Sequence, residues 1–235
     1  MLLEIVEEYC NLLLIHSRLI NSDHMYLTVF WILFCIQHSV FASVWWKRMI
    51  QKILGKSFRF YRFFYSVFAT VSLVFLIYFQ YNIRSSLLWT GSVFLNLIAY
   101  SSAASGILIM LVCMRKYFNF VSGINAFSSQ NSAVSILKTG GMHSYTRHPL
   151  YFGTLLFIWS LFLLFPLWSN LLVCVLITAY TIIGIRIEER KLIIEFGEKY
   201  TDYSSQVPML IPRLFSRRKN VRHQFPETVY SNIAD

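Results

Sequence analysis

The sequence predicts an all-α membrane protein, a multi-pass bundle of about five transmembrane helices. Of the 235 residues, 56% are hydrophobic and only 14% are charged, which is typical of membrane proteins and not of soluble domains. Several apolar runs approach the roughly 20 residues that a helix needs to cross a hydrocarbon core of about 30 Å. Basic residues gather after alternate apolar runs, as the positive-inside rule requires.

Five apolar runs are the candidate spans, and the chain between them is too short for a separate soluble domain. We expect transmembrane helices at residues 25–43, 63–80, 87–114, 150–165 and 169–186, within one membrane domain of residues 25–212. Residues 1–24 are acidic where a signal peptide would be basic, so we expect an amphipathic or partly buried segment there. Residues 213–235 are expected to form a basic, flexible tail.

The basic residues mark one face of the predicted bundle. Six lie in the loop expected at residues 47–62, four at 115–147 and nine at 186–222, whereas Arg84 stands alone after the second span. This alternation predicts an outer N-terminus and a cytoplasmic C-terminus, with a bacterial inner membrane as the location. The net charge of +10 is then explained by topology and anionic lipid. The bilayer is the expected partner, without nucleic acid and without an obligate protein partner.

The sequence lacks the acidic residues of a proton pump and the ligand clusters of a metal site. No Asp or Glu occurs between Asp23 and Glu188, which excludes a carboxylate proton relay within the first four spans. The cysteines are scattered in or beside apolar runs and form no CxxC or Cys/His cluster, so no metal site is expected. These cysteines are Cys10, Cys35, Cys113 and Cys174.

The last two spans are expected to form a hairpin that frames a site. Only residues 166–168 separate them, so the legs must be antiparallel, each about 25 Å long. The N-terminus of one leg and the C-terminus of the other then meet at one membrane face. Residues 147–148 are thereby brought close to residues 186–189, although some forty positions separate them in the sequence.

The head of this hairpin has the features of an anion site. Pro149 suits the first helical position and His148 the N-cap, so that unpaired backbone N–H groups and Arg147 face the interface. Gly153, one turn further in, permits close approach of a ligand or of another helix. The alternative is a purely structural head, in which Arg147 anchors the topology, His148 caps and Gly153 packs.

The second half of the chain resembles the membrane methyltransferases of the isoprenylcysteine carboxyl methyltransferase type. Their signature is an RHPxYxG element, a helical hairpin and a motif rich in Glu, Tyr and Gly. The matching residues are Arg147, His148, Pro149, Tyr151 and Gly153, then Arg186, Glu188, Glu189, Leu192, Phe196, Gly197, Tyr200, Tyr203, Val207 and Pro208. Residues 33–54 also resemble the QHS element of the NnrU-like and methanethiol S-methyltransferase branch.

The resemblance implies an S-adenosylmethionine site at the cytoplasmic face of the last hairpin, covered by a C-terminal interfacial helix segment. It assigns the amino-acid end of the cofactor to the RHPxYxG residues, Arg147, His148, Pro149, Tyr151 and Gly153. It assigns the amine or the ribose hydroxyls to Glu188 and Glu189, and it places Arg186 nearer the reacting centre. The expected acceptor is a small, methanethiol-like thiol, with an isoprenylcysteine or a lipid as the alternative.

Methyl transfer from a sulfonium is an in-line displacement, and a thiol acceptor must first become a thiolate. His38, near the cytoplasmic end of the first span, is the intramembrane histidine placed to act as the base. Its alternative role is a polar contact between helices. Two other functions remain open at this point: a sterol-type reductase that uses NADPH, and a non-enzymatic membrane protein.

Overall fold

The protein is described from a computed structural model, which places residues 2–122 and 137–213, with side chains described for residues 22–115 and 137–213. The order of elements is α1 (Leu2–Ala42), α2 (Val44–Leu54), η1 (Gly55–Phe60), α3 (Tyr61–Asn82), α4 (Val93–Ser122), η3 (Gly141–Ser144), α5 (Pro149–Leu164), α6 (Trp168–Phe196) and α7 (Glu198–Gln206). The fold is all-α, as expected. Apart from one isolated bridge between Leu87 and Leu167, the described residues contain no β-structure.

Four stretches are long and apolar enough to cross a membrane, and they confirm a multi-pass integral membrane protein. These stretches are Ser22–Ala42, Val44–Asn82, Val93–Arg115 and Trp168–Phe196. The expected span at residues 150–165 corresponds to α5, which is apolar but has only 16 residues. At about 1.5 Å per residue α5 is roughly 24 Å long, which is shorter than a typical hydrocarbon core.

The third span begins later than residue 87, where its apolar run starts. α4 begins at Val93, and the residues before it form an extended strap against the turn between α5 and α6. Leu88 N–H donates to the Pro166 carbonyl at 2.8 Å, and Trp168 N–H donates to the Ser86 carbonyl at 3.0 Å. Because these backbone groups pair across the turn, the strap cannot also join the helix.

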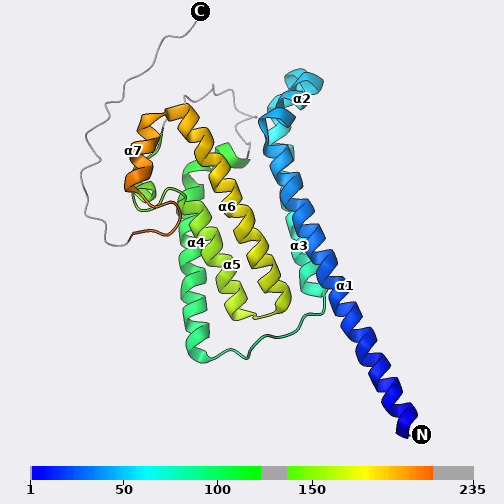
Figure 1. The fold of residues 1–235 in the computed structure, drawn as a ribbon. Coiled ribbons are helices and arrows are strands. Elements are labelled where there is room, and N and C mark those ends of the chain that lie inside the picture. The colour runs from blue at the N-terminus through cyan, green and yellow to red at the C-terminus, as the bar shows by residue number, and fades with distance from the viewer. Residues whose placement is uncertain (1, 123–136, 214–235) are drawn as a thin grey trace, which may run out of the picture.

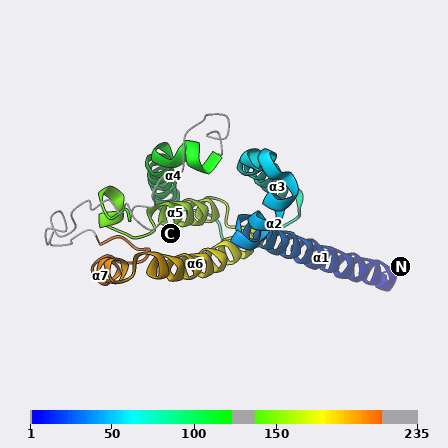
Figure 2. The ribbon, with the colours of Figure 1, turned by 90° about the horizontal axis from the view of Figure 1, so that it is seen from above.

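The helices form two groups, seen side by side in Figure 1 and from above in Figure 2. α4, α5 and α6 lie together in one group, and α1 and α3 form the other, with α1 also contacting α6. An apolar cluster joins the two groups through α1, α3 and α6. Its buried members are Leu27, Trp31, Leu76 and Val173.

The basic segment after the first span is helical, not a loop as expected. Ser43 caps α2 by accepting a hydrogen bond from Trp46 N–H at 3.2 Å. α2 buries no residue, and it exposes Trp45 and Ile53 together with Arg48 and Lys52. Apolar and basic side chains exposed on one short helix are typical of a segment that lies at a membrane surface.

At the C-terminal end of the fold, α6 continues past residue 186 to Phe196, and the chain then turns back sharply. The turn is at Gly197, whose φ of 56° is a conformation that favours glycine. α7 follows at once and packs Tyr200 and Tyr203 against Leu192 and Phe196. This is the expected helical segment that covers the head of the hairpin (Figure 1).

Candidate active site

The head of α5 has the local structure that its sequence predicts. His148 is the N-cap and Pro149 is the first helical residue, so the missing N–H of proline leaves no hydrogen bond unmade. The backbone N–H groups of Arg147 and His148 donate to the carbonyls of Pro208 and Met209, at 2.9 and 3.2 Å. The segment after α7 is thereby tied to the start of α5.

The Arg147 side chain joins three elements at this point. Its Nε donates to Glu189 Oε1 at 2.6 Å, and its Nη1 donates to the carbonyls of Ser204 and Val207 at 2.6 and 2.8 Å. The side chains of Arg147 and Glu189 are only 12% and 18% exposed. A charge-assisted pair with this little exposure fixes the mutual position of α5, α6 and α7.

Two adjacent glutamates take different roles around His148. Glu189 Oε1 accepts from Arg147 and also lies 3.2 Å from His148 Nε2. Glu188 Oε2 lies 3.8 Å from His148 Nδ1 and accepts a hydrogen bond from the Tyr151 hydroxyl at 3.1 Å. Glu189 is thus held in an ion pair, while Glu188, whose side chain is 46% exposed, keeps an accessible carboxylate.

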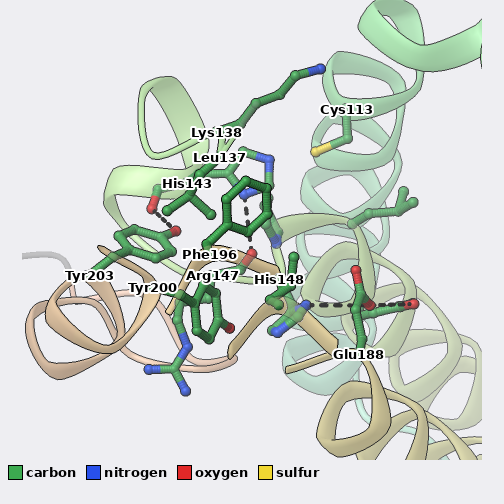
Figure 3. Close-up of a pocket in the computed structure, with 14 residues that line it drawn as sticks. Cys113, Leu137, Lys138, His143, Arg147, His148, Glu188, Phe196, Tyr200 and Tyr203 are labelled. Atoms are coloured by element: carbon green, nitrogen blue, oxygen red, sulfur yellow. Dashed lines mark hydrogen bonds and ion pairs between the residues drawn. The ribbon is translucent and has the colours of Figure 1, made fainter. Parts of the chain in front are cut away.

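A cavity of about 300 Å³ opens beside this cluster, and Figure 3 shows its lining. α5 contributes its first turn to the lining, α6 its last turns, and α7 two aromatic rings. The lining residues are Cys113, Leu137, Lys138, His143, Arg147, His148, Pro149, Leu150, Tyr151, Glu188, Leu192, Phe196, Tyr200 and Tyr203. The cavity therefore combines a helix N-terminus, one exposed carboxylate and an aromatic wall.

The two tyrosines of α7 stay protonated at neutral pH. Burial raises the pKa of Tyr203 to about 12, and its hydroxyl donates to the His143 carbonyl at 2.7 Å. Burial also raises the pKa of Tyr200, and the nearby Glu189 carboxylate acts in the same direction. The Tyr200 hydroxyl is buried beside Glu189 but makes no hydrogen bond within the usual geometric limits to any described residue.

Most of the predicted site residues converge on the cavity, but Gly153 lies elsewhere. A Cβ atom at Gly153 would lie 2.8 Å from Ile109 Cγ2 and 3.1 Å from the Gly106 carbonyl oxygen, both on α4. Gly153 therefore allows α5 to approach α4 closely, as expected from the alternative in which Gly153 serves helix packing. Its expected contact with a cofactor stays a prediction, because it is not part of the cavity lining.

Three further predicted residues lie beside the cavity or away from it. Glu189 lies behind the lining, in its pair with Arg147. Arg186 is exposed on α6 and does not line the cavity, so nothing here places it at a reacting centre. His38 lies on α1, where the Tyr65 hydroxyl is 2.8 Å from its Nδ1. The roles expected for these three residues remain predictions.

Several lining residues were not predicted as site residues. Tyr200 and Tyr203 have a usable signal, since a spacing of three places both rings on one face of a helix. Cys113, Leu137 and His143 come from segments without a recognisable motif, and only the tertiary fold brings them to the cavity. The described residues contain no cluster of three side chains that could ligate a metal ion. The expected absence of a metal remains a prediction.

Comparisons with known proteins point to one enzyme class. The sequence model of the phospholipid methyltransferase family matches residues 94–199. The chain is 31% identical to a methanethiol S-methyltransferase of Crocosphaera subtropica, over 77% of this chain and 71% of the relative. A second methanethiol S-methyltransferase, from Bradyrhizobium diazoefficiens, is also 31% identical, over 84% of this chain and 76% of the relative.

A more distant relative matches only part of the chain. The protein-S-isoprenylcysteine O-methyltransferase of Rattus norvegicus is 34% identical over 118 residues, which are 47% of this chain and 41% of the relative. No solved structure matches the chain. The similarity to the methanethiol S-methyltransferases therefore covers more of the chain than the similarity to the isoprenylcysteine O-methyltransferase.

Proposed function

Because the chain belongs to the family of membrane methyltransferases that includes the methanethiol S-methyltransferases, we propose that it transfers a methyl group from S-adenosylmethionine to a small thiol. The enzyme class follows from the family, and neither a reductase nor a non-enzymatic protein is supported. The donor and the acceptor are the proposal. The observation that carries it is the cavity at the head of α5, where an anion site and an accessible carboxylate lie side by side.

The first turn of α5 suits the carboxylate of the cofactor. The first backbone N–H groups of a helix have no partner within it, and the helix dipole places positive potential there. Leu150 and Tyr151, from this turn, line the cavity, and the N-cap His148 makes no side-chain capping bond that would occupy the turn. An amino-acid carboxylate is a suitable ligand for such an end.

Glu188 suits the amine of the same amino-acid group. Its carboxylate is oriented by the Tyr151 hydroxyl and lies at the cavity, and among the described residues it forms no ion pair with an arginine or a lysine. A zwitterionic ligand thus meets opposite charges on adjacent walls. The Tyr200 hydroxyl, buried beside Glu189, offers a further polar contact.

The remaining residues of the site shape the cavity and exclude water from it. When bound, S-adenosylmethionine supplies a methyl group on a sulfonium, which a thiolate takes by direct displacement. Phe196, Tyr200 and Tyr203 present aromatic faces to the cavity, and such faces stabilise a sulfonium cation. The Arg147–Glu189 pair holds the covering segment in place, so that water is kept from the reacting groups.

We also propose that this end of the bundle faces the cytoplasm of a bacterial inner membrane. The basic helix α2 and the end of α6 that carries the cavity lie at the same end of the molecule, as Figure 1 shows. The turn between α5 and α6 lies at the opposite end, together with the strap that contains Arg84. This distribution of charge supports the proposed orientation.

A second candidate acceptor is a lipophilic molecule, such as an isoprenylated thiol or a lipid. It is favoured by a second cavity of about 390 Å³ between α1 and α3, within the membrane-spanning part. The walls of this cavity are mostly apolar and include Phe30, Phe34 and Phe75, with the Gln37 side chain as a polar contribution. The long apolar chain of such an acceptor fits this cavity, whereas methanethiol has no such chain.

A product screen tests the proposal and separates the two acceptors. The purified full-length protein, in detergent, is given methyl-labelled S-adenosylmethionine with methanethiol, ethanethiol or a farnesylated cysteine derivative, and the methylated product is identified by mass spectrometry. We expect label in the methyl sulfide of a small thiol. Label only in the farnesylated compound would overturn the small-thiol assignment, and no product with any thiol would overturn methyl transfer to sulfur.

A further inference from the structure

A row of tyrosine hydroxyls leads from the cavity into the membrane-spanning part of the protein. At the cavity end, the Tyr151 hydroxyl donates to Glu188. Tyr180, about two helical turns deeper on α6, reaches α1 at Ser39, which is next to His38 in the sequence. Tyr65 of α3 in turn lies against His38 of α1. The row therefore connects three elements of the bundle with the cavity.

The side chains of this row are held in place. The Tyr180 hydroxyl lies 3.0 Å from Ser39 Oγ, which fixes it at the contact between α1 and α6. The Tyr65 ring stacks on Tyr61, with centroids 6.3 Å apart and planes within 6°. An ionisable residue inside a span, such as His38, is costly to place there and is by default a candidate functional position.

Tyr65 lies against the side chain of His38. Its hydroxyl is 2.8 Å from His38 Nδ1 and 3.2 Å from His38 Nε2, and it also lies 3.3 Å from the His38 carbonyl oxygen, to which it can donate. The two rings lie with their centroids 5.5 Å apart. The Tyr65 hydroxyl therefore occupies a hydrogen-bonding position at the His38 ring.

We propose that Tyr65 is a catalytic residue that passes the proton of the acceptor thiol to His38, and that Tyr180 positions the acceptor beside it. This inference rests on the proposed thiol methyltransferase function. It changes the expected role of His38, which becomes the final proton acceptor and acts through Tyr65 without touching the thiol.

The proposed step is balanced in protons and electron pairs. The thiol S–H bond breaks as its proton moves to Tyr65 Oη, while the hydroxyl proton of Tyr65 moves to a ring nitrogen of His38. The electron pair left on the thiolate sulfur forms the new S–CH₃ bond, and the bond between the methyl carbon and the sulfonium breaks with its electrons staying on the donor sulfur. After product release, the imidazolium of His38 loses the proton to water.

The test compares Tyr65→Phe with wild type on thiols of different acidity. Thiophenol is mostly ionised near neutral pH, whereas ethanethiol is almost entirely protonated. Removing a proton relay costs roughly 10²- to 10⁴-fold where the relay is needed. We expect Tyr65→Phe to lose at least 100-fold in kcat with ethanethiol, to lose less than 10-fold with thiophenol, and to bind S-adenosylhomocysteine as wild type does.

Tyr81→Phe is the matched control, because Tyr81 lies on the same helix and is 89% exposed. It should leave both rates unchanged. An equal loss of activity with both thiols would show that Tyr65 acts only through the structure and would overturn the inference, as would full activity with ethanethiol. A wild-type protein that binds no S-adenosylhomocysteine would instead overturn the proposed function.

If Tyr65→Phe does not fold, it will fail to bind S-adenosylhomocysteine. In that case His38→Gln is the variant that tests the inference. It removes the final proton acceptor and leaves the tyrosine ring in place. The inference predicts the same selective loss with ethanethiol, accompanied by recovery of the rate as the pH rises and the free thiol ionises. Equal losses with ethanethiol and thiophenol at every pH would overturn it.

Discussion

Arg147 has a role at the residue scale that its position in the sequence does not reveal. A basic residue at the mouth of a transmembrane helix is commonly an anchor for topology. Here its guanidinium is turned inward, paired with Glu189 and bonded to two carbonyls of the segment that covers the cavity. The pair therefore supports the site, while Glu188, one position earlier, keeps an exposed carboxylate.

Replacing Glu189 tests this division of roles. Glu189→Gln leaves Arg147 with neutral partners in a mostly buried place, so we expect a loss of stability on the order of 2 kcal/mol, less than for a fully buried pair. The thermal unfolding midpoint of the detergent-solubilised protein measures this. Glu195→Gln, an exposed position on the same helix, is the control. Equal midpoints for the two variants would show that the ion pair does not hold the site together.

At the scale of elements, the crossing of α4 and α5 depends on two glycines that face one another. A Cβ atom at Gly106 would lie 2.8 Å from the Gly153 carbonyl oxygen, and one at Gly153 would lie 2.8 Å from Ile109 Cγ2. Close approach of backbones through small residues is a common way to pack helices in membranes. The crossing fixes the depth at which the head of α5 meets the cavity.

Gly153→Ala should therefore force the two helices apart. Ile109 is branched at the contact and its side chain gives way poorly, so we expect a destabilisation of about 1 to 3 kcal/mol. Gly184→Ala on α6 is the control, because an added Cβ there meets nothing within 4 Å. That change should be neutral or stabilise by up to about 1 kcal/mol. Thermal unfolding measures both, and equal shifts would contradict the close packing.

The elements that were predicted from the sequence are those that depend on local chemistry. The cap at His148, the first turn at Pro149 and the hairpin follow from proline geometry and from run length. The strap at residues 83–92 was missed because its apolar residues pair with a distant turn. The inward turn of Arg147 and the buried Tyr200 were also missed, because they depend on where α7 folds.

At the scale of the whole molecule, one end of the bundle gathers the basic helix α2, the head of α5 and α7 (Figure 1). The cavity lies at that end, while the tyrosine row extends from it into the membrane-spanning part. With the proposed function, a water-soluble cofactor would enter from the aqueous side and an apolar acceptor from the membrane. This arrangement suits a reaction that joins a charged donor to a thiol that partitions into lipid.

The proposed orientation rests on the same distribution of charge and can be measured directly. With the site at the cytoplasmic face, green fluorescent protein fused after residue 213 should fluoresce in a bacterial host, and alkaline phosphatase fused there should be inactive. Alkaline phosphatase inserted in the strap at residues 83–92 should be active. The reverse pattern at both positions would contradict the proposed orientation.

The central claim is that the cavity between α5, α6 and α7 binds S-adenosylmethionine, and calorimetric titration with S-adenosylhomocysteine tests it most directly. The full-length protein in detergent should bind with micromolar affinity. Glu188→Gln should weaken binding roughly 10-fold or more, equivalent to about 1.4 kcal/mol, whereas the exposed control Glu195→Gln should bind as wild type does. No detectable binding by the wild-type protein would contradict the claim, and unchanged affinity of Glu188→Gln would contradict the placement of the ligand.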